Sequence, residues 1–131
     1  KRQERGQVRF AGYGVFGSRA GGQGGLDIWL SRRVGGVWQP PENVTAVNTA
    51  GDEGWPFLTP DGSQLWFTRL SGAPELHRSL WVDGEWQPPE LMFTNFAGEA
   101  SLDSQGNVYF THHFYKDNQM LEADIYVAAR R

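Results

Sequence analysis

The chain has 131 residues, a formal net charge of −3 and no cysteine, and its length sets it at one domain at most. Disulfide bonds, cysteine-ligated zinc and thiol catalysis are excluded, and no apolar run approaches the roughly 20 residues of a membrane-spanning helix. The acidic balance gives no electrostatic footprint for nucleic-acid binding, and 17 glycines and 7 prolines disfavour long helices.

The first 49 residues predict four short strands. Aromatic residues make up 14 % of the chain, which argues against disorder. We predict an inner strand at 8–11, a second at 15–19, a third at 27–32 and an outer strand at 37–40. The glycine-rich stretch at 21–25 is predicted as a loop between strands, because no Lys-Ser/Thr and no helix follow it as they would in a phosphate loop.

The next unit predicts the same order of strands. Pro60-Asp61-Gly62 is a turn signal, because proline presets φ and glycine accepts a positive φ. Asp83-Gly84 predicts a hairpin, and Pro88-Pro89 would stop the strand that follows it. In chain order the predicted features are an inner strand at 55–59, a second strand at 64–69, a loop at 70–76, a third strand at 77–82 and an outer strand from Trp86.

Several of these segments recur along the chain. A period of 40–50 residues with four strands in each unit predicts the blades of a β-propeller. The last unit has a second strand at 108–111 and a third strand but no outer strand. The recurrences are Val37 to Glu42 with Glu85 to Glu90; Thr59 to Gly62 with Asp103 to Gly106; and Asp27 to Leu30 with Ser79 to Val82, which aligns Trp29 with Trp81, and with Asp124 to Val127.

The predicted fold is therefore all-β, with about 2.5–3 four-stranded antiparallel blades. The whole chain, 1–131, is one partial propeller whose units span approximately 8–49, 50–96 and 97–131. Closed propellers have roughly four to eight blades. We therefore expect the chain to belong to a longer propeller or to complete a ring with further copies as a homo-oligomer, and an open or rearranged form is the third alternative.

Two strings identify a family resemblance. Gly21-Gly22-Gln23-Gly24-Gly25-Leu26-Asp27-Ile28-Trp29 and Asn48-Thr49-Ala50-Gly51-Asp52-Glu53, the latter followed by Thr59-Pro60-Asp61-Gly62, resemble the WD40-like (PD40) repeat of TolB-like propellers. The last unit has Ser104-Gln105 where the repeat has Pro-Asp. The resemblance covers about residues 14–129. It implies a periplasmic or cell-surface propeller that binds proteins or cell-envelope components, and in some members a non-catalytic gating domain of serine peptidases.

Carboxylates are predicted to gather where the inner strands begin, at one mouth of the propeller channel. Asp52, Glu53 and Glu99 occupy such positions. They can form a site for a polar ligand or a cation, or they can accept hydrogen bonds from loops and fix the spacing of the blades. No cofactor is predicted, and a set of oxygen ligands would suit only Ca²⁺ or Mg²⁺.

An arginine, two histidines and several aromatic residues are further candidates for ligand contact. Arg69 ends a second strand, where it can pair with a carboxylate or bind an anionic ligand. His112 and His113 are predicted to follow the strand at 108–111, and neighbouring strand positions face opposite ways, which disfavours one metal bound by both. Trp55 has no counterpart in the next unit, so it and the predicted loop aromatics Phe114 and Tyr115 are candidates for ligand contact. The recurring tryptophans predict packing between blades; they are Trp29, Trp38, Trp81 and Trp86.

The leading interpretation is a non-enzymatic scaffold that recognises a protein or a cell-envelope component through the channel mouth. The alternative is a glycan-binding or glycan-hydrolysing propeller, with Asp52, Glu53 and Glu99 as candidate acid and base or nucleophile at roughly 5–10 Å. No catalytic residue and no metal site is assigned. The predicted ligand contacts are Glu53, Trp55, Arg69, Glu99, His112 and Tyr115.

Overall fold

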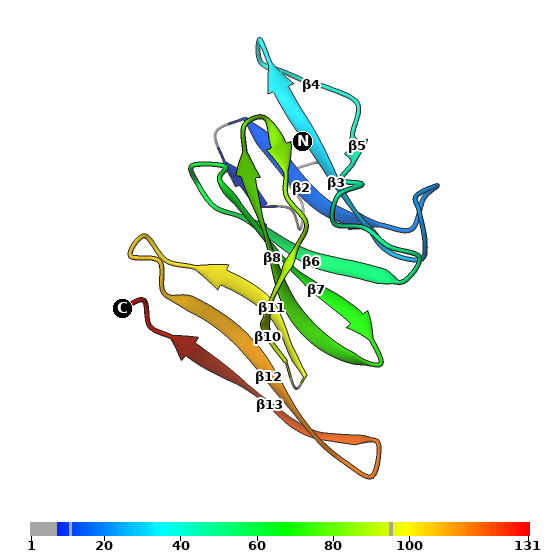
Figure 1. Ribbon diagram of the computed structural model, residues 1–131, viewed down its shortest axis with the longest axis vertical. Coiled ribbons are helices and arrows are strands. Elements are labelled where there is room, and N and C mark those ends of the chain that lie inside the picture. The colour runs from blue at the N-terminus through cyan, green and yellow to red at the C-terminus, as the bar shows by residue number, and fades with distance from the viewer. Residues whose placement is uncertain (1–7, 11, 95) are drawn as a thin grey trace.

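The computed structural model describes residues 8–10, 12–94 and 96–131, with side chains from residue 12 onward. This part of the chain forms thirteen strands in three antiparallel sheets (Figure 1). The described residues contain no helix that could cross a membrane. The predicted all-β class is confirmed. The predicted inner strand at 8–11 corresponds to β1 at Val8–Phe10, and residue 11 lies outside the described residues.

The first sheet follows the order of the chain, from β1 through β4. β5 pairs with the same edge of β3 as β4 does, but nearer to the start of β3. Pro40 and Pro41 separate the two short outer strands, because proline has no N–H to give to a sheet ladder. The outer position is therefore filled by two short pieces. The strands of this sheet are β1 Val8–Phe10, β2 Tyr13–Ser18, β3 Asp27–Val34, β4 Val37–Trp38 and β5 Glu42–Asn43.

The second sheet repeats this layout, and its strands are longer than predicted. Residues 70–76 are not a loop, because Ser71 pairs with Ala73 around Gly72, whose φ of 90° makes the turn. The inner strand begins earlier than predicted, at Asp52, and contains a register shift between Gly54 and Phe57. Its strands are β6 Asp52–Leu58, β7 Gln64–Ser71, β8 Ala73–Val82, β9 Glu85–Trp86 and β10 Glu90–Phe93.

The third sheet contains β11 Ala97–Leu102, β12 Val108–Lys116 and β13 Gln119–Ala128. The prediction that the second strand ends at 111 is wrong, because β12 continues to Lys116 and pairs with β13 along its whole length. Asp117 and Asn118 both have positive φ, 52° and 59°, as a two-residue hairpin turn requires. No fourth strand joins this sheet in the described part of the chain.

Two aspartates hold the turns that join the inner and second strands. The Asp61 carboxylate accepts hydrogen bonds from the Ser63 N–H at 3.0 Å and from the Thr59 hydroxyl, and these bonds lower the pKa of Asp61 below 3.8. In the third sheet the Asn107 amide and backbone likewise lower the pKa of Asp103. The turn at 103–107 therefore forms without the Pro-Asp pair.

Each later sheet packs its inner strand on the sheet before it, as Figure 1 shows from the blue strands to the red. β6 lies against β2 and β3, and β11 lies against β7 and β8. This stacking buries two apolar clusters, one at each junction between sheets. The first contains Val15, Ile28, Leu30, Val44, Val47, Leu58, Leu65 and Phe67; the second contains Phe57, Trp66, Leu76, Ala97, Ala100 and Val108.

Matched hydrogen bonds fix which residues of the first two sheets correspond. The Ser31 hydroxyl donates to the Gln39 carbonyl at 2.6 Å, and the Ser79 hydroxyl donates to the Gln87 carbonyl at 2.5 Å. β3 and β8 therefore correspond with Ser31 aligned to Ser79. The expected alignment of Trp29 with Trp81 is wrong, because the interval between the two serines makes His77 the counterpart of Trp29.

Candidate functional site

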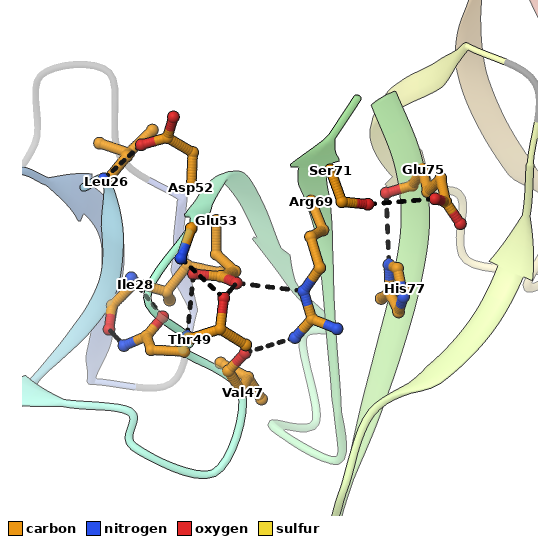
Figure 2. Close-up of polar contacts among 12 residues, drawn as sticks. Leu26, Ile28, Val47, Thr49, Asp52, Glu53, Arg69, Ser71, Glu75 and His77 are labelled. Carbon is orange, nitrogen blue, oxygen red and sulfur yellow. Dashed lines mark hydrogen bonds and ion pairs between the residues drawn. The ribbon is translucent and has the colours of Figure 1, made fainter. Parts of the chain in front are cut away.

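Glu53, at the start of β6, lies at the centre of a polar cluster between the first two sheets (Figure 2). Its side chain is fully buried. The carboxylate accepts hydrogen bonds from the Thr49 N–H at 3.1 Å, from the Thr49 hydroxyl and from the Arg69 Nε–H at 3.1 Å. Arg69 also donates to the Val47 carbonyl at 2.8 Å. Glu53 and Arg69 therefore bind each other and the loop that precedes β6.

The residues around Glu53 attach this loop to the first sheet. The Asn48 side chain accepts from the Ile28 N–H at 2.8 Å and donates to the Ile28 carbonyl at 2.9 Å, as a neighbouring strand would. Asp52 accepts from the Leu26 N–H at 2.6 Å and from Arg19 at 3.1 Å. The two acids are thus occupied by loop and strand donors, which favours their structural role over ligand contact.

Glu99 does not occupy the position of Glu53. Gly54 pairs with Thr68 and Gly98 pairs with Thr111 in matching ladders, so the counterpart of Glu99 is Trp55. Both residues stand at register shifts of their inner strands, with positive φ of 58° and 47°, and both side chains are exposed. Of the three predicted acids, Glu53 is therefore buried, Asp52 is bound by Leu26 and Arg19, and Glu99 is exposed on a bulge.

The remaining predicted contacts lie in β12 and not in a loop. His112 packs against Phe114, with ring centroids 4.5 Å apart, and against Tyr126 at 5.5 Å. Tyr115 stacks on Phe96 at 4.6 Å and is half-exposed. Among the six predicted contact residues, all of them described, a direct polar bond joins only Glu53 to Arg69. The described residues also contain no cluster of three or more acids or histidines that could hold a metal ion.

His77 is a buried titratable group beside this cluster. Its ring stacks on Phe67, with centroids 5.6 Å apart, and Nδ1 lies 3.4 Å from the Glu75 carbonyl oxygen (Figure 2). Burial, and after it the charge of Arg69, lowers the pKa of His77 below 6.5. On acidification the unfolded chain therefore binds a proton at this residue before the folded chain does.

The stability of the protein is expected to fall as the pH drops below about 6.5. A neutral His77 contributes fully above that pH, and its contribution is lost as the pH falls from the unfolded toward the lowered folded pKa. Urea unfolding at pH 7.5 and 5.5 measures this loss. The variant His77→Phe keeps a ring against Phe67 and cannot titrate, so it should lose less stability between the two pH values; an equal loss in both proteins would contradict the assignment.

A cleft opens between the first and second sheets. It has a narrow part of about 90 Å³ and a wider part of about 390 Å³, and Leu30, Arg32, Trp81 and Trp86 line both. The other lining residues are Tyr13, Leu58, Asp61 and Gly62 in the narrow part, and Glu42, Asn43, Val44, Thr45, Ala46, Gly84 and Glu85 in the wider part.

Aromatic rings and an arginine shape the cleft. The rings of Trp81 and Trp86 meet edge to face at 5.1 Å. The Arg32 guanidinium carbon lies 5.5 Å from the ring centroid of Tyr13 and 5.8 Å from that of Trp81. Such contacts hold a guanidinium in place while its N–H groups stay available as donors. The cleft thus offers flat apolar surfaces beside donors from Arg32 and acceptors from Glu42.

The cleft was not predicted from the sequence. Trp81 and Trp86 were expected to pack between blades, and Trp86 does pack partly against the first apolar cluster. One feature of the sequence, at Arg32, could have indicated the cleft. The interval that aligns Trp38 with Trp86 also aligns Arg32 with the apolar Leu80. A cation at a position that is apolar in the next unit points to a local role in binding or packing.

A comparison with protein-family models, curated proteins and solved structures finds no match to this chain. Function is therefore inferred from the geometry of the described residues.

Proposed function

We propose that the three sheets are blades of a partial β-propeller, with units at about 8–49, 50–96 and 97–131. Each sheet runs outward in chain order from its inner strand, and the first two also have outer strands, which is the arrangement of propeller blades. The stacking of β6 and β11 on the preceding sheets supports the same arrangement, as do the matched bonds of Ser31 and Ser79. The resemblance to TolB-like propellers agrees with it, together with a place in the periplasm or at the cell surface.

The proposed function is binding without catalysis. The observation that carries it is the burial of Glu53, whose carboxylate is used by Thr49 and Arg69. Most glycoside hydrolases use two carboxyl groups on one open site. Of the three acids that were candidates for this chemistry, Asp52 accepts from Leu26 and Arg19, and only Glu99 is exposed and unengaged through its side chain in the described residues.

The proposed ligand is a carbohydrate of the cell envelope, bound in the cleft between the first two sheets. Sugar rings have apolar faces that fit against Trp81 and Trp86, and their hydroxyl groups can accept from Arg32 and donate to Glu42. The volume of about 390 Å³ lies in the range of small-ligand pockets. The cleft is preferred to the channel mouth because Glu53 and Arg69, the predicted mouth residues, bind each other.

Titration with neutral and amino-sugar oligosaccharides, followed by calorimetry and tryptophan fluorescence, tests this proposal. The variant Trp81→Ala is expected to weaken binding about tenfold, which corresponds to about 1.4 kcal/mol, and Trp81→Phe should recover part of the loss. Circular dichroism checks that each variant is folded.

Trp55→Ala is the matched control, because Trp55 is exposed on β6 and does not line the cleft. This variant should keep the wild-type affinity. Loss of binding in Trp55→Ala together with normal binding in Trp81→Ala would place the ligand at the start of the inner strands. Absence of binding of every oligosaccharide at millimolar concentration would rule out the proposed ligand class.

A further inference from the structure

The outward face of the third sheet carries apolar side chains that no described sheet covers. Tyr109, Ile125 and Val127 lie on this face, on neighbouring strands that pair Thr111 with Ile125 and Tyr109 with Val127. Ile125 is 79 % exposed and Val127 is 56 % exposed. The opposite face of the same sheet packs Phe110 against the second cluster. Among the described residues, the third sheet is therefore covered on one side only.

The corresponding positions of the other two sheets are buried. Ile125 pairs with Thr111 of the second strand. At the corresponding positions, Ile28 of β3 pairs with Gly17 and Leu76 of β8 pairs with Thr68. Ile28 and Leu76 are both 0 % exposed. Tyr109 corresponds in the same way to Trp66. Trp66 is 3 % exposed, whereas Tyr109 is 39 % exposed. The face of the third sheet thus has the composition of a junction between sheets, and no described strand covers it.

The chain itself shows what covers such a face. β6 covers the first sheet and β11 covers the second, and both are inner strands. β11 approaches closely because Gly98 faces Thr68, and the Glu99 N–H donates to the Thr68 hydroxyl at 2.9 Å. Thr111 is the counterpart of Thr68, so the open face presents the same acceptor. β1 is the inner strand that covers no preceding sheet within the described part.

We propose that the open face of the third sheet binds the first sheet of a second copy of this chain. The contact joins different surfaces of the two copies, so it must be made twice to close. Two copies bring six sheets together, within the roughly four to eight of closed propellers, whereas three copies would exceed that range. The expected assembly is therefore a closed dimer. This inference uses the proposed blade arrangement and is independent of the ligand in the cleft.

Light scattering after size-exclusion chromatography measures the assembly. The wild-type chain is expected at twice its mass of 14.7 kDa, constant over a tenfold range of concentration. Ile125→Asp places a charge in the proposed junction and should give a monomer with an unchanged circular dichroism spectrum, because Ile125 is exposed in the single chain. Val82→Asp is the matched control, since Val82 is a β-branched residue that is 44 % exposed in the second sheet, which takes no part in the proposed junction; it should remain dimeric.

Thiol labelling supplies a readout that does not depend on mass, because the chain has no cysteine. Ile125→Cys should react slowly in the dimer and faster once dilution below the range used for light scattering separates the copies, whereas Val82→Cys should react at one rate. A monomeric wild type, a dimeric Ile125→Asp, or a mass that grows continuously with concentration would each overturn the proposed closed dimer. Such results would not affect the binding of oligosaccharides at Trp81, so each proposal can be contradicted without the other.

Discussion

Replacing Arg69 by methionine is expected to lower the free energy of unfolding by about 3–5 kcal/mol, because it leaves a buried carboxylate without its cation. Glu53 is fully buried, and the Arg69 Nε–H lies 3.1 Å from its Oε1. The same arginine also bonds the Val47 carbonyl, so the change frees the loop before β6. Urea unfolding followed by circular dichroism at one fixed protein concentration measures the loss.

Arg19 provides a matched control for this experiment. Arg19 directly follows β2, and Arg69 lies near the end of β7, the second strand of the next sheet. Arg19 pairs with Asp52 at the same distance of 3.1 Å, but its side chain is 67 % exposed. Arg19→Met should therefore cost less than about 1 kcal/mol. The double variant Glu53→Leu with Arg69→Met should be more stable than Arg69→Met alone, because no unpaired charge stays buried. Equal losses for Arg19→Met and Arg69→Met would contradict this account.

Leu65→Ala is expected to cost about 2–5 kcal/mol, the range for removing a leucine side chain from a well-packed core. Leu65 is fully buried in the first cluster, which contains Val15 and Ile28 from the first sheet and Phe67 from the second. The cavity would therefore weaken the contact between two sheets as well as the packing within one. Urea unfolding again measures the change, with the slope of the transition as a check that both proteins unfold in the same way.

Leu91→Ala is the control for the core variant. Leu91 lies in β10 and is half-exposed, so its loss should change the free energy of unfolding by only about 0.5 kcal/mol. A similar cost for the two leucine variants would mean that the first cluster does not hold the sheets together.

Much of the fold could be predicted because turn chemistry is local. Pro60-Asp61-Gly62 and Asp83-Gly84 fix backbone angles through their own residues, and both sit between strands in the structure. The lengths of β8 and β12 could not be read in this way. His112 and Tyr115 are part of a strand because β13 offers a pairing partner along the whole of β12, and such a partner is a property of the sheet.

The candidate site was less predictable than the fold for a similar reason. A shift of one residue in a strand turns every side chain to the opposite face. Only the ladders decide which residues of two inner strands correspond: Gly54 pairs with Thr68 and Gly98 with Thr111, so Glu99 matches Trp55 and not Glu53. The ion pair between Glu53 and Arg69 agrees with the structural interpretation weighed from the sequence. Arg32 and the cleft depend on how two sheets meet, which no local pattern records.

The proline pairs in the outer strands also bear on how the protein avoids aggregation. A free sheet edge can pair with strands of other molecules, and natural proteins block such edges with proline or with charge. The first two sheets have Pro40-Pro41 and Pro88-Pro89 beside their outer strands, whereas β13 carries the exposed acids Glu122 and Asp124. Salt screens charges but does not restore the missing N–H of proline. Unspecific strand pairing at high salt should therefore begin at the third sheet.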